Sequence, residues 1–265
     1  MHLSGDAGAR IPEWQSTHPD PGNRAQRAEQ RLAGVTAAQL ASTKVNRDSY
    51  LRLVDGMVFG ENPRQGYFKA TRFLHPDLRF ELTFPSGWKT ANLPDAVIGQ
   101  SSDGGAQLQL APGKGTPSEA LQQFIGQQGI TIRQRGNTTI NGIAAVFAEI
   151  DATTESGALR GLVFSLQHRN VTYLLIGITT AQGFAQYGSA IDGAIRSFKD
   201  VSDPAVLNAQ PSKVQIVTLP SQMTGQEFVQ RYPSTIPVEQ VYIINGIDAS
   251  TSVPRGTLMK RVTGG

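Results

Sequence analysis

The sequence contains no cysteine, which excludes disulfides, thiolate metal sites and cysteine nucleophiles. Its four histidines are His2, His18, His75 and His168, and no two of them have the spacing of a His-Glu-x-x-His motif. That motif places two imidazoles one helical turn apart, where both can bind zinc while the Glu activates the zinc-bound water. The chain is therefore not expected to build a standard zinc site alone, and we assign no metal ligands in it. His75 and His168 are expected to have ordinary structural roles.

Long apolar runs are missing as well. No stretch comes near the roughly 18 apolar residues that a membrane-spanning helix needs, so no transmembrane segment is expected. Residues 1–10 lack a basic segment followed by an apolar one, so no signal peptide is expected in this chain. The 24 basic and 21 acidic residues give a net charge of only +3 and form no long run of one sign, which argues against nucleic acid as a partner.

The chain begins with helix-forming segments. With 265 residues, 39% of them hydrophobic, it is large enough for two or three domains. Residues 24–32, after Asn23 as a cap, are rich in helix formers, and a second helix is predicted from residue 47 or 48 until residues 60–66 break it. The apolar face of the second helix is predicted to carry Tyr50, Leu51 and Val54, with Met57 and Phe59 as its continuation. Residues 1–66 are too few for a stable core, so they are predicted to be the tail of a larger domain.

Between residues 67 and 200 the pattern changes to short strands separated by turns. Alternating apolar and polar residues predict half-buried strands, and the Asn141-Gly142 step predicts a hairpin. Thr116 to Glu119 form a capping box that opens one helix, and apolar residues at three- and four-residue spacing predict another over 184–198. The fold class is therefore α+β with an antiparallel sheet. The predicted strands are residues 80–84, 106–110, 130–135, 144–150, 159–167 and 171–179.

A third region follows residues 201–212, which are predicted to be a linker because they contain Pro204 and Pro211. Residues 213–265 are predicted to form a small β-α-α-β module. Its elements are expected at residues 214–219, 225–232, 238–244 and 258–262, and its two strands can pair antiparallel.

Two segments near the start of the chain resemble a known family of enzymes. Residues 16–19 read Ser-Thr-His-Pro and are followed by Arg24, and residues 55–68 read Asp-Gly-Met-Val-Phe-Gly-Glu-Asn-Pro-Arg-Gln-Gly-Tyr-Phe. This order is similar to the C-terminal end of the catalytic domain, and the segment after it, in the His-Glu-x-x-His zinc metallopeptidases that include the CAAX prenyl protease and the periplasmic outer-membrane assembly proteases. The resemblance implies that residues 1–66 are the helical tail of such a catalytic domain.

The same resemblance carries expectations about function. It implies that His18 is an accessory or gating residue near the active site and that Arg24 helps to organise that site. The family's zinc, and its proteolysis of extracytoplasmic proteins, belong to the full-length enzymes. The chain is then expected to be a non-catalytic C-terminal portion, inactive alone, with a catalytic metallopeptidase domain as its partner and a periplasmic or extracellular location.

Residues 67–200 resemble the PsbP-like α/β/α sandwiches. The residues that carry this resemblance are the turn Pro85-Ser86-Gly87-Trp88 and the pair Ser197-Phe198 at the end of the closing helix. Such domains act mostly as binding or assembly modules, which argues against a second active site. Trp88 is either a residue that packs the turn or part of a substrate-binding surface.

Residues 213–265 resemble a degenerate LysM domain. The resemblance rests on residues 223–228, on residues 238–247 with Asn245 and Gly246 at the end of the second helix, and on residues 253–258, while the usual Gly-Asp-Thr opening is absent. It makes Asn245 a candidate substrate-binding residue. The alternative function is therefore a cell-wall module that binds peptidoglycan, or a module for envelope assembly.

Overall fold

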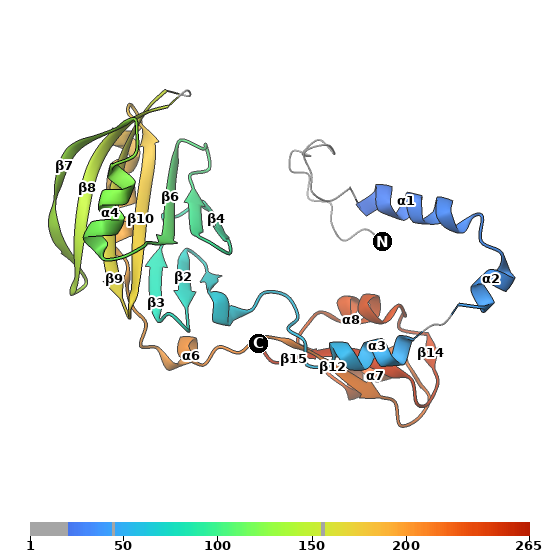
Figure 1. Ribbon diagram of the computed structural model, residues 1–265. Coiled ribbons are helices and arrows are strands. Elements are labelled where there is room, and N and C mark those ends of the chain that lie inside the picture. The colour runs from blue at the N-terminus through green and yellow to red at the C-terminus, as the bar shows by residue number, and fades with distance from the viewer. Residues whose placement is uncertain (1–20, 44–45, 155–156) are drawn as a thin grey trace. The chain divides into compact units, whose positions relative to one another are not determined.

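The computed structural model describes residues 21–43, 46–154 and 157–265 (Figure 1). The chain divides into two compact units between Leu53 and Val54, and each is described by itself. None of the helices in the described ranges is long and apolar enough to cross a membrane.

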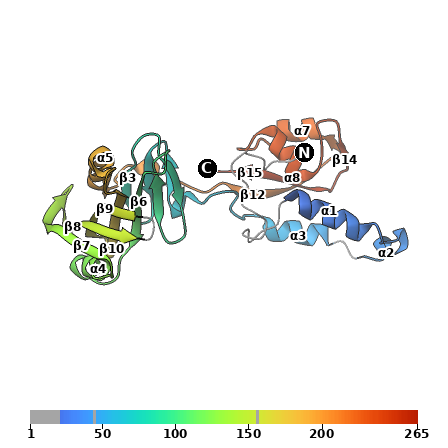
Figure 2. The same cartoon turned by 90° about the horizontal axis from the view of Figure 1, so that it is seen from above.

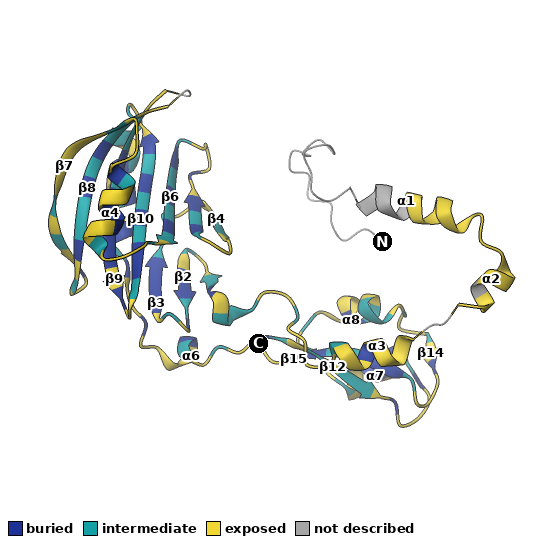
Figure 3. Cartoon of the chain, in the orientation of Figure 1, coloured by how far each residue is buried: buried dark blue, intermediate teal, exposed yellow. Residues whose placement is uncertain are grey.

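The first unit contains helices α1 (Pro21–Leu32), α2 (Ala37–Ala41) and most of α3 (Arg47–Val54). Helix α1 starts at Pro21, earlier than predicted, because proline suits the first position of a helix. Helix α3 ends at Val54, and Gly56 follows it with a φ of 79°, so the predicted continuation to Met57 and Phe59 is wrong. Of the residues between 26 and 53 whose side chains are described, Leu51 alone is buried (Figure 3).

The second unit contains the α+β domain, which has two antiparallel sheets. This confirms the predicted fold class. The larger sheet has seven strands in the order β4-β5-β6-β10-β9-β8-β7, and the smaller has four in the order β1-β2-β3-β11. The predicted hairpin is present, because Asn141 and Gly142 have φ values of 46° and 84°, as a type I′ turn requires. The strands are β1 (Tyr67–Lys69), β2 (Arg72–His75), β3 (Phe80–Thr83), β4 (Lys89–Asn92), β5 (Val97–Gln100), β6 (Ala106–Pro112), β7 (Ile130–Ile140), β8 (Ile143–Thr154), β9 (Gly157–His168), β10 (Val171–Thr180) and β11 (Lys199–Asp200).

Helices α4 (Pro117–Ile125) and α5 (Phe184–Arg196) cover opposite faces of the larger sheet (Figure 2). The predicted capping box is formed, with Thr116 Oγ1 accepting from Glu119 N and the Glu119 carboxylate accepting from Thr116 N. Leu121 and Ile125 of α4 pack on one face of β8 and β9, while Ile191 and Ile195 of α5 pack on the other face. These layers form the α/β/α sandwich.

The core on the α5 side is rich in phenylalanine because the smaller sheet shares this face with α5. Each buried ring of this size contributes about 1.5–3 kcal/mol relative to exposure. The fully buried rings of this core are those of Phe73, Phe80, Phe84, Phe164 and Phe198.

The predicted linker contains a short helix, α6 (Pro204–Leu207), whose Val206 packs with Leu74 and Val201.

Residues 213–265 form the predicted β-α-α-β arrangement. Strands β12 (Lys213–Thr218) and β15 (Leu258–Thr263) pair antiparallel, and helices α7 (Gly225–Arg231) and α8 (Val238–Asn245) lie between them in the sequence. Two short strands, β13 (Met223–Thr224) and β14 (Ser252–Val253), also pair. The module has its own core of Leu219, Met223, Phe228, Val241, Val253 and Met259.

A segment before the α+β domain pairs with this module. Gly56 N donates to Val214 O at 2.8 Å, and Phe59 N donates to Ser212 O at 2.8 Å. Asp55 Oδ1 accepts from Ile216 N at 2.9 Å. Residues that the sequence assigned to the helical tail thus extend the sheet beside β12, and the predicted domain boundaries at 66, 200 and 212 stay predictions.

Candidate functional site

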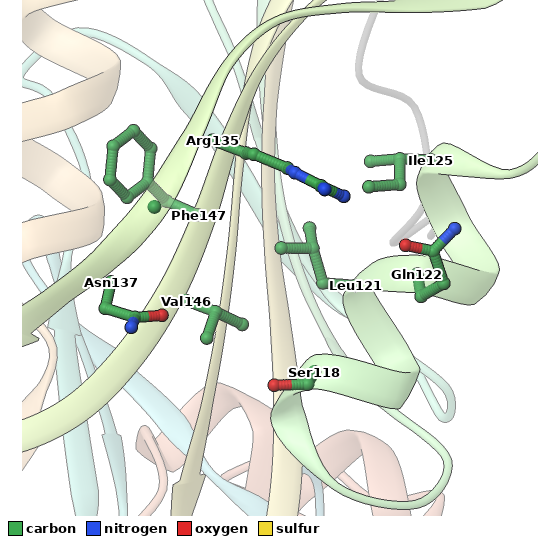
Figure 4. Close-up of a pocket in the computed structure, with 9 residues that line it drawn as sticks. Ser118, Leu121, Gln122, Ile125, Arg135, Asn137, Val146 and Phe147 are labelled. Atoms are coloured by element: carbon green, nitrogen blue, oxygen red, sulfur yellow. The ribbon is translucent and has the colours of Figure 1, made fainter.

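A groove of about 340 Å³ lies between α4 and strands β7 and β8 (Figure 4). The register of β7 against β8 shifts between Ile132 and Gln134, just before the part of β7 that lines the groove, and such a bulge bends a strand. Gly136 lies next to the Phe147 ring, 3.1 Å from the point where a Cβ would stand, so little space is left there for a side chain. We call this site the α4 groove. It is lined by Ser118, Leu121, Gln122, Ile125, Arg135, Gly136, Asn137, Val146 and Phe147.

The charge in the α4 groove comes from Arg135, which Figure 4 shows extending across the groove toward Ile125. The neighbouring Arg133 is paired, with Nε 3.2 Å from Glu149 Oε1 and Nη1 2.9 Å from Asp151 Oδ2. Hydrogen bonds from Arg160 and Arg133 lower the pKa of the Asp151 carboxyl. Arg135 has no such pair within the described part of the chain, so its charge is available to a ligand.

The chemistry of the α4 groove favours binding. Leu121, Ile125 and Val146 offer an apolar surface, and Arg135 offers a cation that can bond to a carbonyl or carboxylate. Ser118 is the only hydroxyl among the lining residues, and none of the lining residues could act as its general base. Over the described ranges there is also no group of three His, Asp or Glu side chains that could hold a metal ion.

The two site residues taken from the metallopeptidase resemblance cannot be compared with this geometry. His18 lies outside the described residues, and Arg24 lies in α1 but its side chain is outside them too. The accessory roles of His18 and Arg24 stay predictions.

Trp88 and Asn245 both have internal contacts. Trp88 is half-buried against the core and meets the Tyr187 ring edge-on, with ring centroids 6.5 Å apart. The Asn245 amide nitrogen donates to Val241 O at 2.9 Å and to Lys260 O at 2.8 Å, and Asn245 Oδ1 accepts from Lys260 N at 2.8 Å. Asn245 therefore fastens α8 to β15, and both of its amide hydrogens are used. Substrate binding by either residue stays a prediction.

His168 is buried and has a structural role. Its Nε2 lies 3.0 Å from Arg79 O, and its ring meets the Phe198 ring edge-on at 5.7 Å between centroids.

Arg135 in the α4 groove was not predicted as a site residue from the sequence, although it lies at the end of a predicted strand. A strand pattern carries no signal that the helix before it, α4, will lie beside the strand and form a groove with it.

Comparison with known proteins adds similarities of fold. No family model matches the chain, and no curated protein matches it. Among solved structures, the chain is similar to cyanobacterial PsbP (CyanoP) from Synechocystis sp., with a TM-score of 0.41 and 14% identity, over 50% of this chain and 94% of that one. It is also similar to LpqN of Mycobacterium tuberculosis, a protein involved in cell envelope biogenesis, with a TM-score of 0.32 and 12% identity, over 46% of this chain and 83% of that one. Similarity at this level carries no conclusion about function.

Proposed function

We propose that this chain is the non-catalytic C-terminal portion of an extracytoplasmic zinc metallopeptidase, with the α+β domain and residues 213–265 as binding or assembly appendages. The order of the segments 16–19, 24 and 55–68 supports the family relationship. The absence of a His-Glu-x-x-His motif from the sequence supports the view that catalysis requires another domain.

The observation that carries this proposal is the exposure of the N-terminal helices. Leu32 on α1 and Leu53 on α3 are 57% and 78% exposed, although apolar residues on helices normally face a core, and Val35 between α1 and α2 is 37% exposed. Helices of 12, 5 and 8 residues are too short to be stable without tertiary packing. This exposure supports a partner that covers the helices, and a catalytic domain to which they belong would supply that packing.

Complementation with a catalytic domain tests this proposal. The purified chain is expected to hold no stoichiometric zinc and to leave casein uncut, whereas addition of a family domain that carries the His-Glu-x-x-His helix is expected to give chelator-sensitive cleavage. His18→Ala and Arg24→Ala are expected to lower the restored rate by roughly 10–100-fold, as loss of a residue that supports a metal site does. The measurements are metal analysis and the rate of casein cleavage.

Arg31→Ala is the matched control, because Arg31 is an exposed arginine in the last turn of the same helix. It is expected to leave the restored rate unchanged. Zinc or chelator-sensitive cleavage in the chain alone would overturn the non-catalytic assignment, and equal rates in all three variants would reject the roles given to His18 and Arg24.

A second candidate function is peptidoglycan binding by residues 213–265. It is favoured by the module's own core and by the exposed apolar residues Val238 and Ile243 on α8, each 43% exposed. Purified peptidoglycan is expected to retain the full chain and to release a chain that ends at residue 212. The measurement is the fraction of protein in the pellet, and equal retention of both forms would count against the module as the binder.

A further inference from the structure

Two adjoining hollows open where the smaller sheet meets the β4–β5 turn and the ends of β6 and β10. The smaller has a volume of about 150 Å³ and the larger about 650 Å³. Both are lined by Gln65, His75, Leu78, Asn92, Leu93 and Pro94. We call the smaller hollow the Tyr173 pocket. Among the residues that line it but not the larger hollow are Phe73, Phe80 and Tyr173.

Tyr173 is the first reason to expect a ligand in the Tyr173 pocket. The residue is 3% exposed, and its buried hydroxyl has no hydrogen-bond partner within the described residues. The ring packs edge-on against Phe80 and at a tilt against Phe198, with centroids 5.2 Å and 5.6 Å apart, contacts that a phenylalanine would make equally well. Since an unpartnered buried hydroxyl destabilises the fold, a ligand that bonds to it would remove that cost. Burial raises the pKa of Tyr173 to about 12, so the hydroxyl keeps its proton at neutral pH.

His75 supplies a second donor to the same pocket. Its Nδ1 accepts from Leu78 N at 3.2 Å, so in the neutral ring the proton is on Nε2. Burial lowers the pKa of His75, with the Asp77 charge acting in the opposite direction, and the neutral ring is therefore favoured at pH 7. Nε2 has no hydrogen-bond partner among the residues described, so its N–H is available for an acceptor atom.

The rest of the lining limits the size and charge of the ligand. Most of the other side chains that line the Tyr173 pocket are apolar, and an apolar cavity of about 150 Å³ is large enough for benzene. Arg64 lines the larger hollow but is held by the Asp77 carboxylate and by Leu207 O, so no unpaired cation is offered to an anion. The Asp95 carboxylate also lines the Tyr173 pocket, but Asp95 is exposed in the β4–β5 turn, where water and salt screen its charge. A neutral ligand is therefore favoured.

We infer that the Tyr173 pocket binds a neutral, roughly benzene-sized ring that carries an oxygen acceptor such as a ketone, with the Tyr173 hydroxyl and His75 Nε2–H as its donors. The adjoining larger hollow leaves room for the remainder of a bigger molecule. This site is independent of the protease relationship and of the α4 groove.

Titration of the full chain with acetophenone and ethylbenzene tests this inference, because the two probes have similar shapes and differ in the carbonyl oxygen. Both are expected to shift the amide resonances of residues that line the pocket, and acetophenone is expected to bind more tightly. Tyr173→Phe is expected to weaken acetophenone binding about tenfold, the effect of one hydrogen bond, and to change ethylbenzene binding less than about twofold. The measurement is the dissociation constant from two-dimensional NMR.

Tyr187→Phe is the matched control, because it removes a hydroxyl from the same domain that is bonded to Asp103 outside the pocket. It is expected to change neither dissociation constant. Absence of shifts with both probes, as in a pocket that holds only water, would overturn the inference, and so would equal acetophenone binding by the wild type and Tyr173→Phe.

A second variant keeps the test decisive if Tyr173→Phe disturbs the core. Ala96 is half-buried in the β4–β5 turn and lines the pocket, so Ala96→Leu places three further carbon atoms there. This variant is expected to lose the binding of both probes while the resonances of α4 and β7 stay unchanged. Retained binding would show that the probes bind elsewhere and would overturn the assignment.

Discussion

Gly225→Ala is expected to destabilise residues 213–265 strongly while the α+β domain keeps its stability. A Cβ at Gly225 would lie 2.1 Å from the carbonyl oxygen of Asp248, far closer than any real contact. The obstacle is a backbone atom, and its turn is held in place, because Asp248 Oδ1 accepts from Ser250 N at 2.9 Å and from Thr251 N at 2.7 Å. The clash therefore has no flexible side chain that could move away at low cost.

The size of the effect follows from the size of the module. Overpacking a well-packed site costs about 1–3 kcal/mol, and occasionally more, and an approach to a fixed carbonyl oxygen places Gly225→Ala at the upper end. A module of about 50 residues is stable by only about 3–8 kcal/mol on the usual scale per residue. A loss of about 3 kcal/mol would thus remove between roughly a third and all of the module's stability. The measurement is amide hydrogen exchange by mass spectrometry, in which peptides of β12 and β15 are expected to lose protection and peptides of β9 and β10 to keep it.

Gly246→Ala is the control for this experiment. Gly246 follows α8 in the left-handed region, at a φ of 67°, but no atom lies within 4 Å of the position that a Cβ would take. Its replacement should cost only about 1 kcal/mol of backbone strain, so protection should fall slightly. Wild-type protection in Gly225→Ala would contradict the close approach of α7 to the Asp248 turn.

Long elements with local signals could be predicted from the sequence. Strands β8, β9 and β10 are ten or more residues long, which is enough for a strand pattern to show in the sequence, and α4 carries its capping box within four consecutive residues. Strands β1, β2, β4 and β5 were missed, because three or four residues are too few to show a period, and β4 reads Lys-Thr-Ala-Asn. The pairing of β6 with β10 joins distant residues and has no local signal.

The candidate sites were harder to predict from the sequence, because they too depend on contacts between residues that are distant in the chain. The Tyr173 pocket brings together β2, the β4–β5 turn and β10, and its two donors come from residues whose neighbours in the sequence look ordinary. Tyr173 reads as one more apolar residue in an alternating strand, and only the packing reveals that its hydroxyl has no partner. By contrast, the resemblances for residues 16–24 rest on the order of residues, and the described part of the structure does not test them.

Phe198→Ala is expected to lower the free energy of unfolding of the α+β domain by about 3–5 kcal/mol. The side chain is 0% exposed and stacks on Phe80, with centroids 5.1 Å apart and planes 18° apart. Phe198 lies between α5 and β11, so its ring joins the helix to both sheets, and its carbonyl accepts from Asn141 Nδ2 at 2.9 Å. Truncation would leave a cavity bounded by rigid rings and strands, which cannot collapse to fill it.

Thermal and urea unfolding followed by circular dichroism measure this loss, with a decrease in melting temperature of roughly 10 °C or more. Phe124→Ala is the matched control, because Phe124 is only half-buried at the edge of α4 and should cost about 1–2 kcal/mol. Equal losses in the two variants would contradict the central position of Phe198. Because the Tyr173 ring rests on Phe198, the same truncation should also weaken acetophenone binding in the folded variant, whereas Phe124→Ala should leave that binding unchanged.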